Sequence, residues 1–156
     1  TAWKAVCNFT GLEHRMQLVR KLNGVNWYND SKGTNVGSVV KSLSGLQAPV
    51  TLIAGGKDKG GAYAPLRELV EEKVANLILI GEAAQRIAEE LSGASEIRLA
   101  ATLDAAVQQA YEVTLAGGTV LLSPACSSFD MFKSYAVRGQ EFARLVQLLP
   151  AEGDTA

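Results

Sequence analysis

Residues 50–56 read VTLIAGG, a run of β-branched and apolar side chains that ends in two glycines. Polar and apolar positions do not alternate in this run, which predicts a strand buried on both faces. Three further short runs follow it: NLILIG at 76–81, a weaker EIRLA at 96–100, and TVLLSPA at 119–125. Each of them also predicts a buried strand.

Segments with helical patterns lie between and after these runs, at about 35–45, 65–73, 82–92, 102–116 and 129–149. Thr102 and Asp130 are the predicted starts of the last two, and Pro65 sits where a first-turn proline is favoured. Strands and helices that alternate in this way predict an α/β domain. Its fold would be a Rossmann-like open sheet, mostly parallel, with helices on both faces. The predicted buried stripe of the last helix is Phe129, Phe132, Phe142, Leu145 and Leu148.

The N-terminal region predicts a different kind of pairing. MQLVRKL at 16–22 and VNWYND at 25–30 flank Asn23-Gly24. Asn-Gly between two such runs is a strong signal for a two-residue hairpin turn. We therefore expect an N-terminal antiparallel hairpin beside the parallel sheet.

Composition excludes several classes of protein. A chain of 156 residues with 47% hydrophobic residues and a net charge of -1 suits one folded domain, without a basic nucleic-acid footprint. No apolar run reaches the roughly 20 residues that span a bilayer. We expect a cytoplasmic protein that binds neither nucleic acid nor membrane. Cys7 and Cys126 lack metal-ligand spacing and there is one histidine, so both cysteines are expected as thiols and no metal site is predicted.

Polar loops follow the predicted strands: NDSKGTN at 29–35, GGKDKGGAY at 55–63, GEAA at 81–84 and SPACSSFD at 123–130. Carboxyl ends of parallel strands share one edge of the sheet, where helix N-termini favour anions. These loops, with the preceding hairpin, supply cations and hydroxyls but no evident nucleophile and base. The residues alone predict an anionic ligand and leave the reaction open. The set is Arg15, Lys32, Thr34, Lys57, Lys59, Ser127 and Ser128.

Known phosphate motifs do not fit these loops. GGKDKGG lacks the G-x-x-x-x-G-K-[ST] spacing, and no G-x-G-x-x-G opens a helix after a first strand. DSKGT at 30–34 differs in residue order from the Asp-Lys-Thr-Gly-Thr of aspartyl-phosphate ATPases. A plain surface turn stays an alternative for NDSKGTN, because these residue types favour turns.

Four segments carry a family resemblance: FTGLEHRMQLV at 9–19, NDSKGTNVGSV at 29–39, AGGKDKGG at 54–61 and LLSPACSSFDMFKSYAVRGQEFARLV at 121–146. In this order they resemble the C-terminal domain of a Mur ligase. The resemblance implies that residues 1–10 end a linker from a central domain, that 11–150 form the amino-acid-binding domain, and that 151–156 are a tail. It also implies that the N-terminal and central domains are partners missing from this chain.

The resemblance assigns roles in the loop at 29–35 and in the preceding hairpin. Arg15 resembles the arginine that reaches the ATP ribose and phosphates, and Asp30 resembles the acid at the ribose. Lys32 resembles a catalytic lysine beside the reacting phosphate, and Thr34 a residue on the substrate carboxylate. The mixed composition of NDSKGTN would then reflect a position between nucleotide and amino acid.

The remaining implied contacts concern the amino acid. Lys59 resembles the lysine that meets a carboxylate of D-glutamate, while Ser128 and the backbone near Tyr135 resemble the clamp on its other carboxylate. The chain departs from the family pattern at three positions. Lys57 and Ala62 stand where acids are common, and Tyr135 stands where phenylalanine is common.

The reaction implied by the resemblance is the addition of D-glutamate to UDP-N-acetylmuramoyl-L-alanine, with ATP and an acyl-phosphate intermediate. Magnesium would be bound mainly by the central domain, and the protein is expected to be a monomer. Two alternatives stay open. One is a related Mur or folylpolyglutamate ligase domain, and the other is a stand-alone nucleotide- or amino-acid-binding module.

Overall fold

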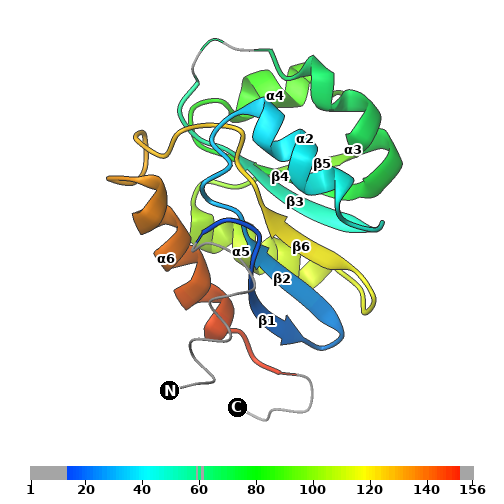
Figure 1. Ribbon diagram of the computed structural model, residues 1–156, viewed down its shortest axis with the longest axis vertical. Helices are drawn as coiled ribbons and strands as arrows, with labels where there is room; N and C mark the ends of the chain where they lie inside the picture. The colour runs from blue at the N-terminus through cyan, green and yellow to red at the C-terminus, as the bar shows by residue number, and fades with distance from the viewer. Residues whose placement is uncertain (1–13, 59, 61, 152–156) are drawn as a thin grey trace.

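The computed structural model describes residues 14–58, 60 and 62–151. In this part of the chain a single sheet of six strands runs through the molecule, with helices packed on both of its faces (Figure 1). The strands are β1 (Gln17–Leu22), β2 (Val25–Asn29), β3 (Val50–Gly55), β4 (Val74–Ile80), β5 (Glu96–Leu99) and β6 (Thr119–Leu122). The helices are α2 (Val36–Ser44), η1 (Ala64–Leu66), α3 (Arg67–Lys73), α4 (Ala84–Glu90), α5 (Leu103–Val113) and α6 (Tyr135–Gln147).

The strand order is β1-β2-β6-β3-β4-β5. Within the described sheet β2, β6, β3, β4 and β5 are parallel, and β1 pairs antiparallel with β2. This confirms the predicted open, mostly parallel α/β sheet with an N-terminal hairpin. The prediction that the strand at 96–100 is buried is wrong, because β5 lies at the edge of the sheet and its residues are mostly exposed. Strand β6 comes last in sequence but lies between β2 and β3, so its loop reaches the loops of both neighbours.

The hairpin turn follows from its two central residues. Asn23 and Gly24 both have positive φ, at 53° and 80°. Asparagine and glycine tolerate this region, and two such residues match the right-handed twist of the flanking strands. A Cβ on Gly24 would also lie 3.0 Å from the Cβ of Ala116, a contact tighter than usual, so a larger residue would require a small shift there. The predicted antiparallel pair is confirmed.

Alternate residues of the central strands point into two cores. Leu52, Leu77 and Leu121 face one layer, which contains α2, η1, α3 and α4. Ile53, Ile78 and Val120 face the other layer, which contains α5 and α6. Both sets are fully buried, which explains why these strands lack polar alternation.

The predicted helix starts at Thr102 and Pro65 are confirmed. The Thr102 side chain accepts a hydrogen bond from the Ala105 N–H and caps α5. Pro65 lies in the first turn of η1, which leads directly into α3. A proline costs nothing in that position because first-turn N–H groups have no partner within the helix.

The predicted start of the last helix at Asp130 is wrong. Helix α6 begins at Tyr135, and the side chain of Ser134 caps it by accepting from the Val137 N–H. Asp130 is engaged elsewhere, because its carboxylate accepts a hydrogen bond of 2.9 Å from the Glu82 N–H.

The predicted buried stripe of this helix is correct only in its middle. Phe142 and Leu145 are buried, whereas Phe129 and Leu148 are each 68% exposed. Phe129 lies in the loop before the helix, and Phe132 there is half-buried. The prediction is wrong at residues outside the helix, where helical periodicity does not apply.

Replacing Ser134 with alanine should lower the free energy of unfolding by about 1 kcal/mol, because α6 loses its N-terminal cap. Urea denaturation followed by circular dichroism measures the change. Ser92→Ala is the matched control, since Ser92 is exposed after α4 and caps no helix. An equal effect of both substitutions would contradict the capping role.

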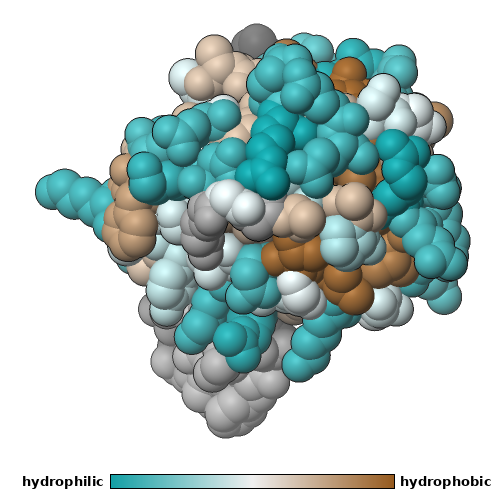
Figure 2. Space-filling view, turned by 90° about the horizontal axis from the view of Figure 1, so that it is seen from above, coloured by the Kyte–Doolittle hydropathy of each residue, from teal (hydrophilic) through white to brown (hydrophobic). Residues whose placement is uncertain are grey.

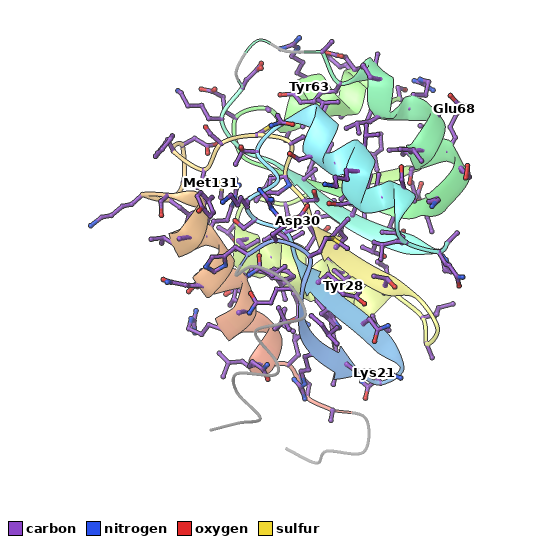
Figure 3. All side chains as sticks on the ribbon, in the orientation of Figure 1. Lys21, Tyr28, Asp30, Tyr63, Glu68 and Met131 are labelled. Carbon is purple, nitrogen blue, oxygen red and sulfur yellow. The ribbon has the colours of Figure 1, made fainter. Side chains whose placement is uncertain are left out.

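The sheet sets the position of the polar loops. Figure 3 places Asp30, directly after β2, near the middle of the molecule, and Lys21 in the opposite direction, near the hairpin turn. The segments after β2, β3, β4 and β6 therefore leave the same edge of the sheet. Among the described residues no helix is both long and apolar enough to cross a bilayer.

Candidate functional site

Backbone hydrogen bonds join the polar loops at the carboxyl edge of the sheet. The Ala125 N–H donates to the Gly33 carbonyl at 2.9 Å, which joins the loop after β6 to the loop after β2. The Lys57 N–H donates to the Ser127 carbonyl at 3.0 Å, which joins the loop after β3 to the same segment. The predicted meeting of these loops is confirmed.

The Asp30 carboxylate lies at the centre of this edge and is 3% exposed. Its Oδ2 accepts hydrogen bonds from the hydroxyls of Ser42 at 2.6 Å and Ser123 at 2.8 Å. Its Oδ1 accepts one from the Met16 N–H at 3.2 Å. Three donors from three different segments therefore compensate this buried charge and tie the start of the hairpin, α2 and the end of β6 together.

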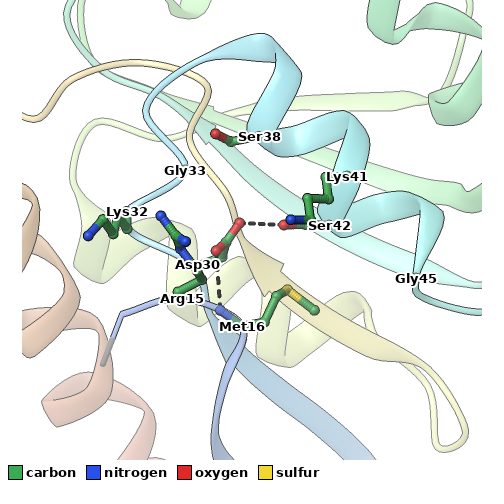
Figure 4. A pocket seen from close by; sticks show the side chains of 9 residues that line it. All are labelled: Arg15, Met16, Asp30, Lys32, Gly33, Ser38, Lys41, Ser42 and Gly45. Carbon is green, nitrogen blue, oxygen red and sulfur yellow. Dashed lines mark hydrogen bonds between the residues drawn. The ribbon is translucent and has the colours of Figure 1, made fainter. Parts of the chain in front are cut away.

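A pocket of about 300 Å³ opens beside Asp30 (Figure 4). Its charged lining consists of Arg15, Lys32, Lys41 and Asp30. Three cations and one acid give this lining a net positive charge. The hydroxyl of Ser38 adds a polar group from α2. An anion with several oxygens, such as a phosphate, suits this set of groups.

The structure places the two predicted nucleotide residues together. Arg15 is exposed and Asp30 is buried, and both line this pocket. Lys32, the predicted catalytic lysine, lines the same pocket and extends over the ring of Tyr135, with Nζ 5.6 Å from the ring centroid. A cation over an aromatic face is attracted by the ring quadrupole. Lys32 thus lies between Arg15 and Asp30 on one side and the start of α6 on the other.

A second pocket, of about 360 Å³, lies at the N-terminus of α2. Thr34, another predicted site residue, lines it together with Gly37, Ala62 and Tyr63. No charged side chain among the described residues lines it, and its polar groups include the Thr34 hydroxyl and the first turn of the helix. Free N–H groups there favour a carboxylate. Ala62 adds no charge to this pocket.

The predicted amino-acid clamp is only partly described. Ser128 is 2% exposed, and its Oγ is buried with no hydrogen-bond partner within the described ranges. Tyr135 is 37% exposed, and its carbonyl accepts a hydrogen bond from the Ser31 hydroxyl at 2.7 Å. Lys59 lies outside the described residues. The described clamp residues thus adjoin the loop at 29–35 through Tyr135.

Arg138 is a site-supporting residue that the sequence reasoning missed. It is 1% exposed, and its guanidinium donates to the Ser31 hydroxyl at 2.9 Å, the Ser31 carbonyl at 2.7 Å and the Cys126 carbonyl at 3.1 Å. Burial lowers the pKa of Arg138 to about 10, so it stays charged at neutral pH. One side chain of α6 therefore fastens the loop after β2 to the loop after β6. One feature of the sequence indicates its burial: Arg138 lies four residues before Phe142, which places both on the buried face of the helix.

An ion-pair cluster fixes the loop after β3. Arg86 on α4 contacts Asp58 at 2.8 Å and Glu90 at 2.9 Å, and it lies over the ring of Tyr63. A hydrogen bond from the Gly60 N–H is the main cause of the lowered pKa of Asp58, and Arg86 adds to it. Burial raises the pKa of Tyr63. Lys57 is exposed beside this cluster.

Figure 2 shows the molecule from above, and hydrophilic side chains cover most of this face. Apolar side chains gather in a smaller patch near its middle. Within the described ranges, no group of three or more His, Cys, Asp or Glu side chains could hold a metal ion. The polar groups that the described site presents are Lys, Arg, hydroxyl and backbone N–H groups.

A mostly parallel open sheet with cationic and hydroxyl-bearing loops at its carboxyl edge is the arrangement of α/β domains that bind ligands at that edge. The sequence pattern of the family described as "Mur ligase, glutamate ligase domain" matches residues 14–126. The chain belongs to this family, and the expected resemblance is confirmed.

The comparison with curated proteins gives more detail. The chain is 68% identical over 152 residues to UDP-N-acetylmuramoylalanine--D-glutamate ligase of Syntrophotalea carbinolica. That match covers 97% of this chain and 34% of the relative. This chain thus spans about a third of the relative's length and corresponds to its C-terminal part.

Solved structures share the fold. A murein peptide ligase, Mpl, from Psychrobacter arcticus matches with a TM-score of 0.63 at 10% identity, over 90% of this chain and 31% of that chain. The MurF ligase of Thermotoga maritima, solved in complex with ADP, matches with a TM-score of 0.54 at 15% identity, over 88% of this chain and 32% of that chain. At these identities the likeness concerns the fold.

Proposed function

We propose that this chain is the amino-acid-binding part of an ATP-dependent ligase that adds D-glutamate to UDP-N-acetylmuramoyl-L-alanine. The name of the relative with 68% identity supports this assignment. The observation that carries it is the pair of pockets beside NDSKGTN, one lined by three cations and one at the N-terminus of α2. A polyanionic nucleotide suits the first, and an amino-acid carboxylate suits the second.

In this proposal ATP supplies the phosphoryl group that converts the alanine carboxylate into an acyl phosphate. The amine of D-glutamate then attacks the acyl carbon, the amide C–N bond forms, the C–O bond to phosphate breaks, and the amine loses a proton. ADP and phosphate are the other products. The acyl-phosphate intermediate carries the negative charge of its phosphate group, which nearby cations stabilise.

The residues of this chain would act mainly by binding and positioning. Arg15 holds the nucleotide phosphates, with Asp30 at the ribose. Lys32, between the nucleotide pocket and Tyr135, offers a positive charge to the reacting phosphate. Correct placement of amine and acyl carbon supplies several kcal/mol of the barrier in reactions of this type.

The amino acid would be held next to this group. Thr34 and the first turn of α2 bind one carboxylate together with Lys59, and Ser128 with the backbone near Tyr135 binds the other. The buried Oγ of Ser128, which has no hydrogen-bond partner among the described residues, supports this role, because a ligand oxygen would give it a partner. The isolated domain is proposed to be inactive, since the phosphate loop belongs to the missing part of the protein.

The remaining partners are also part of the proposal. Magnesium would be bound mainly by the missing central domain, because the described residues offer no cluster of acids for it. The full-length protein would be a cytoplasmic monomer in peptidoglycan precursor synthesis.

Replacing Arg15 with alanine in the full-length enzyme should raise the KM for ATP about tenfold or more, while the KM for D-glutamate stays within about threefold. Charge-assisted hydrogen bonds are worth about 1.5–3 kcal/mol, which sets this magnitude. Steady-state kinetics with each substrate varied in turn provides the measurement.

Arg98→Ala is the matched control, because Arg98 is exposed on β5 at the far edge of the sheet. Equal losses for both substrates in Arg15→Ala would reject its assignment to the nucleotide.

A further inference from the structure

The turn that carries Arg15 has an unusual backbone. His14 has φ 63° and Met16 has φ 45°, so both neighbours of Arg15 adopt the left-handed region. Residues with side chains adopt this region rarely, and they do so where the surroundings enforce it. Strain of this kind on both sides of one exposed arginine indicates that the position of the Arg15 side chain matters.

Hydrogen bonds from neighbouring segments enforce the turn. The Lys32 N–H donates to the His14 carbonyl at 2.9 Å, and the His14 N–H donates to Gln17 Oε1 at 3.2 Å. The Met16 N–H donates to Asp30 Oδ1 at 3.2 Å. Backbone groups on both sides of Arg15 are thereby held by the loop that follows β2.

The His14 ring is fixed from two directions. It is buried, and Asn29 Nδ2 lies 3.0 Å from its Nδ1. Because Asn29 Oδ1 accepts from the Ser31 N–H at 3.0 Å, the amide faces the ring with its NH₂ group, which donates to Nδ1. The same NH₂ group donates to the Gly139 carbonyl on α6 at 3.2 Å.

Gly139 completes the seat of the ring. A Cβ at this position would overlap the His14 Nδ1, so any larger residue would push the ring away. Tyr135, one turn earlier on α6, meets the His14 ring edge to face at a centroid distance of 6.2 Å. The ring thus lies between the end of β2 and the helix that borders the amino-acid side of the site.

We propose that His14 is a positioning residue that locks the strained turn and presents Arg15 to the nucleotide pocket, with Asn29 and Gly139 as its seat. The inference rests on the proposed function, in which Arg15 contacts the nucleotide. It makes α6 a determinant of nucleotide binding although none of its residues lines the pocket described beside Asp30.

The test uses the full-length enzyme and two substitutions on opposite sides of the contact. His14→Ala removes the ring, and Gly139→Ala displaces it. Each should raise the KM for ATP and the Kd for ADP about tenfold, with the KM for D-glutamate within about threefold. Titration calorimetry gives the Kd, and thermal melting verifies that each variant is folded.

Ala143→Gly is the matched control on the same helix. It weakens α6 through its glycine but leaves the seat of His14 unchanged, so it should lower the Tm and leave the Kd for ADP within about twofold. A loss of ADP affinity in this control equal to that in Gly139→Ala would overturn the proposal, because general weakening of α6 would then account for both.

Double mutants identify the route of the effect. Adding Gly139→Ala to His14→Ala should cost nothing further, since no ring is left to displace. Adding His14→Ala to Arg15→Ala should likewise leave the Kd for ADP unchanged within about twofold. Additive losses in either pair would overturn the positioning role.

The two proposals fail in distinguishable ways. If Arg15→Ala alone leaves the Kd for ADP unchanged, the nucleotide assignment of Arg15 fails and the inference with it. If Arg15→Ala weakens ADP while His14→Ala does not, only the positioning role of His14 is rejected.

Discussion

Arg138→Ala is expected to lower the free energy of unfolding by about 3 kcal/mol or more and to reduce kcat/KM at least about a hundredfold. The substitution leaves the carbonyls of Ser31 and Cys126 without their buried donor, and each unsatisfied group costs about 1–3 kcal/mol. The activity falls because the loops after β2 and β6 lose their common fastening, and small displacements of reacting groups can cost about a hundredfold in rate. Urea denaturation and steady-state kinetics measure the two effects.

Two further variants define the cause. Arg144→Ala removes an exposed arginine that pairs with Glu141 on the same helix, and it should change stability by less than about 1 kcal/mol. Arg138→Lys keeps the charge but loses the planar fork that reaches three acceptors, so it should recover only part of the loss. A wild-type unfolding curve for Arg138→Ala would contradict the fastening role.

Residues 1–156 alone are expected to fold cooperatively and to release no ADP from ATP in the presence of both substrates. Cooperative folding is expected because two buried clusters pack on a continuous six-stranded sheet. Inactivity is expected because no segment matches the loop that cradles β and γ phosphates. Thermal melting and a coupled assay of ADP release provide the measurements.

A second experiment combines this chain with the rest of the protein. Adding the missing N-terminal and central domains as a separate fragment should give measurable turnover, at a level set by the affinity between the pieces. Arg15→Ala in the shorter piece is the control, since it should reduce that turnover. ADP release by residues 1–156 alone would refute the placement of the phosphate site in the missing domains.

Much of the fold could be predicted because its signals are local. Uninterrupted runs such as VTLIAGG predicted central strands, since a strand covered on both faces needs no polar side. Asn23 and Gly24 predicted the hairpin through their tolerance of positive φ. The meeting of the polar loops at one edge then followed from parallel topology alone.

Other features depended on partners that are distant in sequence. Asp130 has the composition of a helix cap, but its carboxylate binds the Glu82 N–H, and Ser134 takes the capping role. No sequence pattern singled out Arg138, because its acceptors lie at Ser31 and Cys126, far away in the sequence or outside its helix. Such contacts are set by tertiary packing, which a local pattern does not contain. The role of Lys59, outside the described residues, stays a prediction.

The position of β6 between β2 and β3 also governs when the domain can form. Strand β2 ends at Asn29, yet its parallel neighbour does not begin until Thr119. Thr119 comes 90 residues after Asn29 and 64 residues after Gly55, the end of β3, so during synthesis the hairpin and β3 both exist long before the strand that joins them. Pairings this distant in sequence close late, because loop closure costs entropy before any contact compensates it. The site, built on the loops of these same strands, is consequently assembled last.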